Sequence, residues 1–400
     1  PASRADSLAT VPPLQGGPYA VGCSSVEQDF SRVPPGENAE WWWEGVPTED
    51  GTPRYLTTLL STSATPVLTI PVPDDSVLYG PHAGTSVPVV LFVCYPTDAD
   101  NPYADYALPT GKSVPHMQRG GDPPRFASAR ARWPVLLYSH GYGGSPISGD
   151  YVSALVLLAS HGYAVVAPFH GDQRIANLRL EDASDLLNAI ANFSKFTAMQ
   201  AVRPLALAAA LDYVLGSPGW KDRLDATQVA GFGASQGGES LMLMAGAKLT
   251  VSVGLSSKQV MSDPRLKVIT SYVPYFGQPF FPAFGRDQGG VDDMRPVPVL
   301  AISGTADTTA PLGTTEQAMR RLVQSRILVA LEGVEHGFDQ ASRDDIFTWT
   351  LQFLLAHAQD DRSARATLQR MERVEGGGDD RRVIDYTAPA PASGGERIVV

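Results

Sequence analysis

The chain has 400 residues, of which 43% are hydrophobic and 18% are charged, and its formal net charge is -11. This length suffices for a sizeable buried core, and the apolar content excludes an intrinsically disordered chain. The acidic balance argues against nucleic acid or an anionic membrane as the main partner, because phosphate binding needs a basic surface. No run approaches the roughly 20 apolar residues of an integral membrane segment.

Two cysteines, Cys23 and Cys94, are too few for a four-cysteine metal site, and there is no CxxC motif. The chain begins at Pro1 without an apolar leader, and we expect that a signal peptide has been removed from a secreted or periplasmic protein. In such a compartment Cys23 and Cys94 can form a disulfide, and two buried free thiols are the alternative. The 38 glycines and 33 prolines are typical of a loop-rich exported protein.

Along the chain, residues 1–65 are rich in Gly, Pro and Ser and predict an extended arm that lies over the body. Two early strands are expected at 66–72 and 86–95, followed by a long polar loop. From Trp133 onward, strands and helices alternate. The strands are expected at 133–139, 163–169, 227–235, 251–255, 267–273, 297–303 and 326–332, and the helices near 150–160, 198–215, 311–324 and 343–357, with the second helix beginning near Arg203-Pro204.

This alternation predicts an α/β fold with a mostly parallel central sheet and helices on both faces. One catalytic domain is expected over 66–360, with the N-terminal arm before it. Within it, residues 172–200 form either a small lid or an ordinary helix between two strands. Residues 361–400 are expected to form a C-terminal surface extension.

The central motif is Gly233-Ala234-Ser235-Gln236-Gly237. A G-x-S-x-G pentapeptide is weak evidence by itself, but this one directly follows an apolar strand and precedes a helix-forming run. In that setting the flanking glycines permit a sharp turn that leaves the Ser235 hydroxyl accessible as a nucleophile. The alternative is a Gly-rich turn with a capping serine.

A serine hydroxyl needs a base, and two histidines follow Ser235 in the chain. His357 lies in an apolar helical run, whereas His336 directly follows the strand at 326–332. The carboxyl end of a parallel strand is where an α/β sheet presents its functional groups. We therefore expect His336 to be the base.

An acid should orient this base, and Asp307 follows the strand at 297–303. The chain order Ser, Asp, His is that of the α/β-hydrolase fold. Rival acids are Glu335, Asp292 and Asp293. Glu335 is next to the histidine, where backbone geometry disfavours a contact with its ring.

Two backbone N–H groups are needed to stabilise the oxyanion of a tetrahedral intermediate. One is expected from Gln236, directly after the nucleophile. The other is expected from Tyr142, in the Gly-rich loop 139–144 that follows an early strand. His140, in the same loop, is expected to make a structural hydrogen bond rather than to act as the base.

Residues 136–172, with YSHGYGG and ASHGYAVVAPFHGD, resemble the platelet-activating-factor acetylhydrolase branch of the α/β-hydrolases, as do GASQGG and EHGFD. The segment PVLAISGTADTTAP resembles bacterial cutinase-like polyester hydrolases. Both resemblances imply a serine esterase with Ser235 as nucleophile, Asp307 as orienting acid and His336 as base. They also imply Tyr142 and Gln236 as oxyanion donors. Ala234 stands where both families usually carry a histidine.

The aromatic residues between the strands at 267–273 and 297–303 predict a pocket for an apolar or aryl acyl group. They are Tyr275, Phe276, Phe280 and Phe281. A satellite core under a long loop is the alternative. No zinc spacing, phosphate loop or dinucleotide fingerprint occurs, so we expect no cofactor and no metal.

The sequence thus predicts a secreted serine hydrolase that cleaves carboxylic esters through an acyl-enzyme. Hydrophobic, aryl or polymeric esters are the favoured substrates. A C–C (β-diketone) or amide hydrolase with the same triad is the first alternative. A hydrolase-fold binding protein that has lost catalysis is the second.

Overall fold

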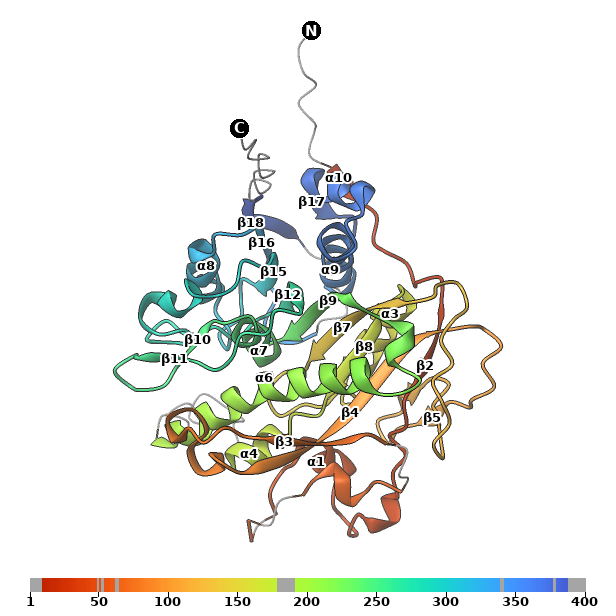
Figure 1. Ribbon diagram of the computed structural model, residues 1–400. Helices are drawn as coiled ribbons and strands as arrows, with labels where there is room; N and C mark the ends of the chain where they lie inside the picture. Colours follow the sequence, from red (N-terminus) through yellow and green to blue (C-terminus); the bar gives the residue numbers. More distant parts are fainter. Residues whose placement is uncertain are drawn as a thin grey trace, which may run out of the picture.

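The computed structural model describes residues 9–48, 50–51, 54–61, 65–177, 191–338, 342–376 and 379–387. Its centre is a ten-stranded sheet in the order β18-β16-β15-β12-β9-β7-β8-β4-β2, with β3 also paired to β4 (Figure 1). The six strands from β16 to β8 are parallel, and antiparallel strands extend both edges. The strands are β2 (Ala20–Cys23), β3 (Val67–Pro71), β4 (Ser86–Thr97), β7 (Trp133–Ser139), β8 (Ala164–Pro168), β9 (Leu224–Ala234), β12 (Leu266–Tyr272), β15 (Val299–Gly304), β16 (Arg326–Leu331) and β18 (Asp380–Tyr386). The predicted mixed α/β fold with a mostly parallel sheet is confirmed.

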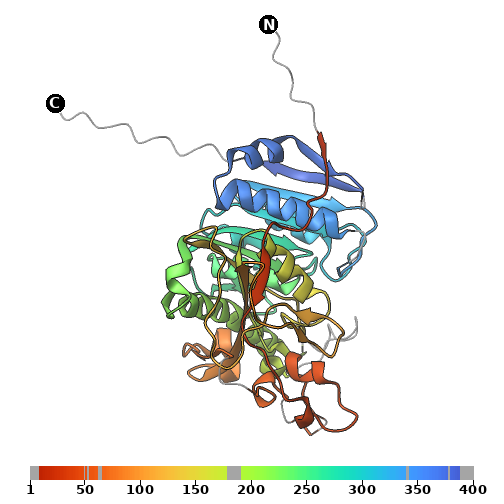
Figure 2. The same ribbon diagram turned by 90° about the vertical axis from the view of Figure 1, so that its right-hand side faces the viewer.

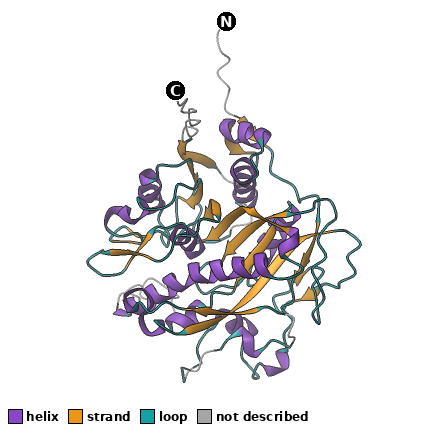
Figure 3. Ribbon diagram, viewed as in Figure 1, coloured by secondary structure: helices purple, strands orange, loops and turns teal. Residues whose placement is uncertain are grey.

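Helices cover both faces of this sheet (Figure 3). Along β7, Val135 and Leu137 belong to one core and Leu136 and Tyr138 to the other, which explains the continuous apolar run of this strand. Helices α6 and α7 pack in the first core, and α3 and α9 in the second. The main helices are α3 (Tyr151–Ser160), α6 (Phe193–Gly216), α7 (Gln236–Met244), α8 (Leu312–Arg321) and α9 (Arg343–Ala358).

Shorter helices and strands lie around the central sheet and its main helices. They are α1 (Ala39–Glu44), α2 (Ser76–Tyr79), α4 (Asp172–Ala176), α10 (Arg362–Arg370), β1 (Ala9–Val11), β5 (Tyr106–Ala107), β6 (Ser113–Val114), β10 (Lys248–Thr250), β11 (Ser257–Gln259), β13 (Gly277–Gln278), β14 (Phe281–Pro282) and β17 (Met371–Val374). The predicted alternatives for 172–200 are only partly visible, because residues 178–190 lie outside the described residues.

Helix α6 begins at Phe193, ten residues before the Arg203-Pro204 step where the sequence suggested a start. Pro204 lies inside the helix, where its ring nitrogen cannot donate the usual backbone hydrogen bond. Among the described helices, α6 is the one long and apolar enough to cross a membrane by length and composition. However, 67% of its most apolar window is buried within the protein, as in a core helix.

The predicted strand at 251–255 is wrong. These residues form a turn between β10 and β11, a small antiparallel hairpin outside the central sheet. Val253 is exposed and Leu255 has a φ of 62°, a left-handed conformation that a strand does not contain. The apolar alternation of VSVGL therefore did not reflect a buried strand.

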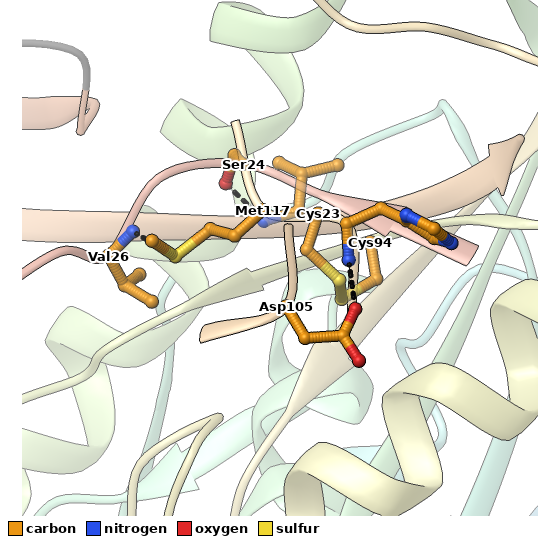
Figure 4. Close-up of a disulfide and its surroundings, with 8 residues drawn as sticks. Cys23, Ser24, Val26, Cys94, Asp105 and Met117 are labelled. Carbon is orange, nitrogen blue, oxygen red and sulfur yellow. Dashed lines mark hydrogen bonds between the residues drawn. A yellow bond between two sulfur atoms is a disulfide. The ribbon is translucent and has the colours of Figure 1, made fainter. Parts of the chain in front are cut away.

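The N-terminal arm contributes a strand to the sheet rather than only lying over it. Strand β2 pairs antiparallel with β4, and Cys23 lies opposite Cys94. The two cysteines form a disulfide (Figure 4), as the sequence allowed. Beside it, Met117 accepts a hydrogen bond from the backbone of Val26.

The C-terminal segment after 360 is also part of the body. Strand β18 completes one edge of the central sheet, and β17 pairs with β1 from the N-terminal arm (Figure 2). Asp380 anchors this segment because it accepts hydrogen bonds from the Trp349 indole (2.5 Å) and the Val374 backbone. Residues 361–376 and 379–386 of the expected surface extension therefore contain one helix and two strands, and one of these strands belongs to the central sheet. The strand β18 was not predicted because several of its residues are charged, as is common in strands at an exposed sheet edge.

Candidate active site

Ser235 lies at a sharp turn between β9 and α7. Its φ of 51° and ψ of -119° are sparsely populated for a residue with a side chain, so the turn is strained. A Cβ on Gly233 would lie 2.3 Å from the backbone of Gly237, and a Cβ on Gly237 would lie 1.8 Å from the Ser139 carbonyl oxygen. Both glycines of the pentapeptide are therefore required by close backbone contacts.

Hydrogen bonds hold this strained turn in place. The Ser235 N–H donates to the Tyr272 carbonyl (2.9 Å), at the end of β12. The Ser235 carbonyl accepts from Gly238 (3.0 Å) and from Tyr275 (2.9 Å). The turn is thus tied to the neighbouring strand and to the loop that follows it.

The structure brings the three predicted catalytic side chains together. His336 Nε2 is 3.0 Å from Ser235 Oγ, and His336 Nδ1 is 2.8 Å from Asp307 Oδ2. Because Nδ1 donates to the carboxylate, Nε2 is left to accept the serine proton. The three residues follow β9, β15 and β16, at the carboxyl ends of parallel strands.

Asp307 is held in a fixed orientation. Its side chain is fully buried, and its Oδ1 accepts hydrogen bonds from the backbone N–H groups of Thr309 (2.9 Å) and Ala310 (2.8 Å). The His336 side chain is 27% exposed, whereas Ser235 is only 9% exposed, so solvent reaches these hydrogen-bonded side chains mainly at the histidine. This arrangement can transfer a proton from the serine to the imidazole while the carboxylate stabilises the resulting charge.

The rival groups lie elsewhere. Asp292 pairs with Arg321 and Asp293 with Lys248. These contacts occupy the two carboxylates, and Glu335 is exposed. His357 lies on α9 with its ring packed on Phe353 (4.4 Å between centroids), and burial lowers its pKa to about 4.

The loop 139–144, at the end of β7, lies beside Ser235. A Cβ on Gly141 would be 3.4 Å from the Cβ of Ser235, and the Gly141 N–H donates to the Tyr151 hydroxyl (3.1 Å). On the other side of Ser235, Gln236 is the first residue of α7, and the first N–H groups of a helix have no acceptor within it. The two segments expected to supply oxyanion donors thus flank the serine.

His140 has the predicted structural role. Its Nδ1 donates to the Gly141 carbonyl (2.8 Å), and its Nε2 accepts from the backbone of His170 (3.1 Å). Burial, aided by the nearby positive charge of Arg203, lowers the pKa of His140 to about 4. The His140 ring therefore bridges two loops at the end of the sheet.

The four aromatic residues expected to line a pocket have different positions. Phe276 is buried and packs against Phe284, so it belongs to the core. Tyr275 is half-buried next to Ser235 in the backbone hydrogen-bond network. Phe281 contacts Phe193 edge to face, and Phe280 is 62% exposed.

The hairpin that carries Phe280 and Phe281 is tied to the acid loop. Gln278, on β13, donates a hydrogen bond to the carbonyl of Thr309 (2.8 Å), two residues after Asp307. Phe280 follows two residues later, between β13 and β14. An exposed phenyl ring therefore lies two residues after a side chain that is hydrogen-bonded to the loop carrying Asp307.

Sequence reasoning missed a group of buried charged and polar residues near the Ser235 turn. They are Asp172, Gln200, Arg203 and Glu239. The GxSxG-x-E spacing of Glu239 and the HGD sequence at the start of α4 were visible, but nothing in the sequence indicated that these side chains converge. Tyr272 was also missed: its hydroxyl donates to the Gly337 carbonyl and its own carbonyl accepts from Ser235, which joins the histidine loop to the elbow.

Within the described residues, no three His, Cys, Asp or Glu side chains are grouped as metal ligands would be. The site therefore consists of a hydrogen-bonded serine, histidine and aspartate at the carboxyl edge of a parallel sheet. No known protein-family model matches this sequence. No curated protein matches it either.

Proposed function

We propose that this protein is a serine esterase with an α/β-hydrolase fold, similar to the platelet-activating-factor acetylhydrolase and cutinase-like branch. The observation that carries the proposal is the hydrogen-bonded chain from Ser235 Oγ to His336 (3.0 Å) and on to Asp307 (2.8 Å). The strained elbow and the mostly parallel sheet add support.

In the proposed reaction, Ser235 Oγ attacks the ester carbonyl while His336 Nε2 takes its proton. The carbonyl oxygen becomes an oxyanion, stabilised by the N–H groups of Tyr142 and Gln236. When the intermediate collapses, the ester C–O bond breaks and His336 returns the proton to the leaving alcohol. Water, deprotonated by His336, then releases the acid and restores Ser235.

The exposed aromatic hairpin supports a hydrophobic or polymeric ester as substrate. Phe280 offers an apolar contact next to the acid loop, which suits a chain or surface that extends beyond the reacting bond. The Cys23–Cys94 disulfide supports an exported protein, because disulfides persist in oxidising compartments.

A fluorophosphonate probe tests the proposal. The probe should label the wild type and the matched control Ser128→Ala, whose serine is exposed on a loop away from the triad. Ser235→Ala should abolish labelling and ester hydrolysis, and Asp307→Asn should lower kcat by about 10⁴-fold because the imidazole is then held in the wrong tautomer. Labelling that survives Ser235→Ala would contradict the proposal.

Substrate panels then separate the bond types. p-Nitrophenyl esters of increasing chain length should be hydrolysed faster than a matched anilide or a β-diketone. Preference for the anilide or the diketone would favour an amide or C–C hydrolase. A protein that binds the esters but neither reacts with the probe nor turns over would be a binding protein.

A further inference from the structure

The guanidinium of Arg203, in the middle of α6, contacts both segments that are expected to stabilise the oxyanion. Nη1 donates to the His140 carbonyl (2.9 Å) and Nη2 to the Gly141 carbonyl (3.1 Å), both in the loop 139–144. Nη1 also donates to Ser240 Oγ (3.3 Å), and that hydroxyl donates to the Gln236 carbonyl (2.8 Å). One side chain therefore links the oxyanion loop to the first turn of α7.

Asp172 completes this arrangement. It accepts paired hydrogen bonds from Arg203 (both 2.8 Å), and both side chains are 1% exposed. Its Oδ2 also accepts from the Gly143 N–H (3.1 Å). A buried ion pair is weak evidence for a role in stability, because desolvation offsets its attraction. Here the pair contacts three residues of the loop, His140, Gly141 and Gly143, which indicates a role in loop geometry.

The hydrogen bonds determine which way the Gly141–Tyr142 peptide faces. Its carbonyl accepts from Arg203 Nη2 and from His140 Nδ1. In a trans peptide the carbonyl and the following N–H point in opposite directions, so the Tyr142 N–H faces away from Arg203. A flipped peptide would present a carbonyl oxygen in place of that donor. The loop is rich in glycine, which lowers the barrier to such alternatives.

We infer that Arg203 is a positioning residue for the oxyanion site. It acts through the Gly141–Tyr142 peptide and, by way of Ser240, through the first turn of α7. This inference rests on the proposed serine-hydrolase function. Because the oxyanion forms only during the reaction, losing Arg203 should lower kcat and leave KM nearly unchanged.

Two variants test the inference. Arg203→Gln/Asp172→Asn removes both charges together, so neither is left buried and unpaired. Arg203→Lys keeps the charge but lacks the planar fork that reaches two carbonyls and a carboxylate. We expect kcat to fall roughly 10- to 100-fold in both, less than the 10²–10³-fold effect of losing a donor itself. KM should stay within about twofold, and the pH profile should keep its midpoint because the triad is untouched.

A second readout does not depend on turnover. Amide hydrogen exchange of residues 139–144 should become faster in both variants. The matched control is Arg265→Gln/Asp263→Asn, which removes another paired Arg–Asp contact away from the loop. It should change neither kcat nor exchange in 139–144. If Arg203→Gln/Asp172→Asn does not fold, the kcat and the hydrogen exchange of Arg203→Lys alone test the inference.

The outcomes separate the two hypotheses. An active, labelled wild type together with variants that fold, retain kcat and show unchanged exchange would overturn the positioning role while the proposed function stands. A wild type that neither reacts with the probe nor hydrolyses esters would overturn both. A triad defect would instead shift the pH profile, and that result would also count against the inference.

Discussion

Glu239 lies in the first turn of α7, four residues after Ser235. The residue is 1% exposed, and its Oε1 accepts a hydrogen bond from the Gln200 amide (2.6 Å). Burial raises its pKa from 4.5 to about 8, although the Gln200 hydrogen bond and the charge of Arg203 act in the opposite direction. Glu239 should therefore hold a proton at neutral pH.

This proton makes stability depend on pH. Between pH 4.5 and about 8, the folded protein binds one proton at Glu239 that the unfolded chain has released. Raising the pH therefore favours the unfolded state by about 1.4 kcal/mol per unit, or about 5 kcal/mol over the whole interval. Below pH 4.5 Glu239 is protonated in both the folded and the unfolded state, so the free energy of unfolding does not change with pH through this group. Above about pH 8 Glu239 is ionised in both states, and the accumulated loss of stability stays constant.

Glu239→Gln removes this dependence while it retains the shape and the acceptor for Gln200. Urea unfolding at pH 5, 6, 7 and 8 should show the variant gaining stability relative to the wild type at each step. Other titrating groups cancel in this difference. The control Glu316→Gln alters a partly exposed residue paired with Arg320 and should give a constant difference across the same range. Parallel pH curves for the wild type and Glu239→Gln would refute the reasoning.

Two further predictions concern the disulfide and the aromatic hairpin. Cys23→Ala/Cys94→Ala opens a link across a sequence separation of 71 residues and should lower the free energy of unfolding by about 4 kcal/mol, measured by urea titration. A change below about 1 kcal/mol would contradict that estimate. Phe280→Ala, at a position 62% exposed, should leave hydrolysis of a short soluble ester within about twofold but slow hydrolysis of an insoluble polyester film at least about fivefold. Equal losses on both substrates would contradict a role in surface contact.

Much of the site could be predicted from the sequence because its signals are local. The elbow needs two glycines at fixed positions around Ser235, and close backbone contacts at Gly233 and Gly237 explain why. Asp307 and His336 each directly follow an apolar strand, and parallel strands place their carboxyl ends at one edge. Local pattern and one topological rule were therefore enough to group three residues separated by up to 101 positions.

The same local rules failed where a pattern had two interpretations. The VSVGL run has the apolar alternation of a strand but forms a turn, because its glycine and its serine favour a turn and the pairing of β10 with β11 does not involve it. The charged residues 380–386 read as a surface tail, but the open edge of β16 provides backbone partners for them. Pro204 suggested a helix start, yet packing against the sheet maintains α6 through it.

The sequence by itself determined the alternating α/β order, the strained serine turn and the identity of the three hydrogen-bonded side chains. Each of these depends on a few neighbouring residues and on backbone sterics. Only the tertiary structure decided that Arg203, 63 residues from His140, reaches the loop 139–144, and that Glu239 is buried enough to keep its proton. Those properties depend on desolvation and on distances between distant segments, which exist only once the helices pack on the sheet.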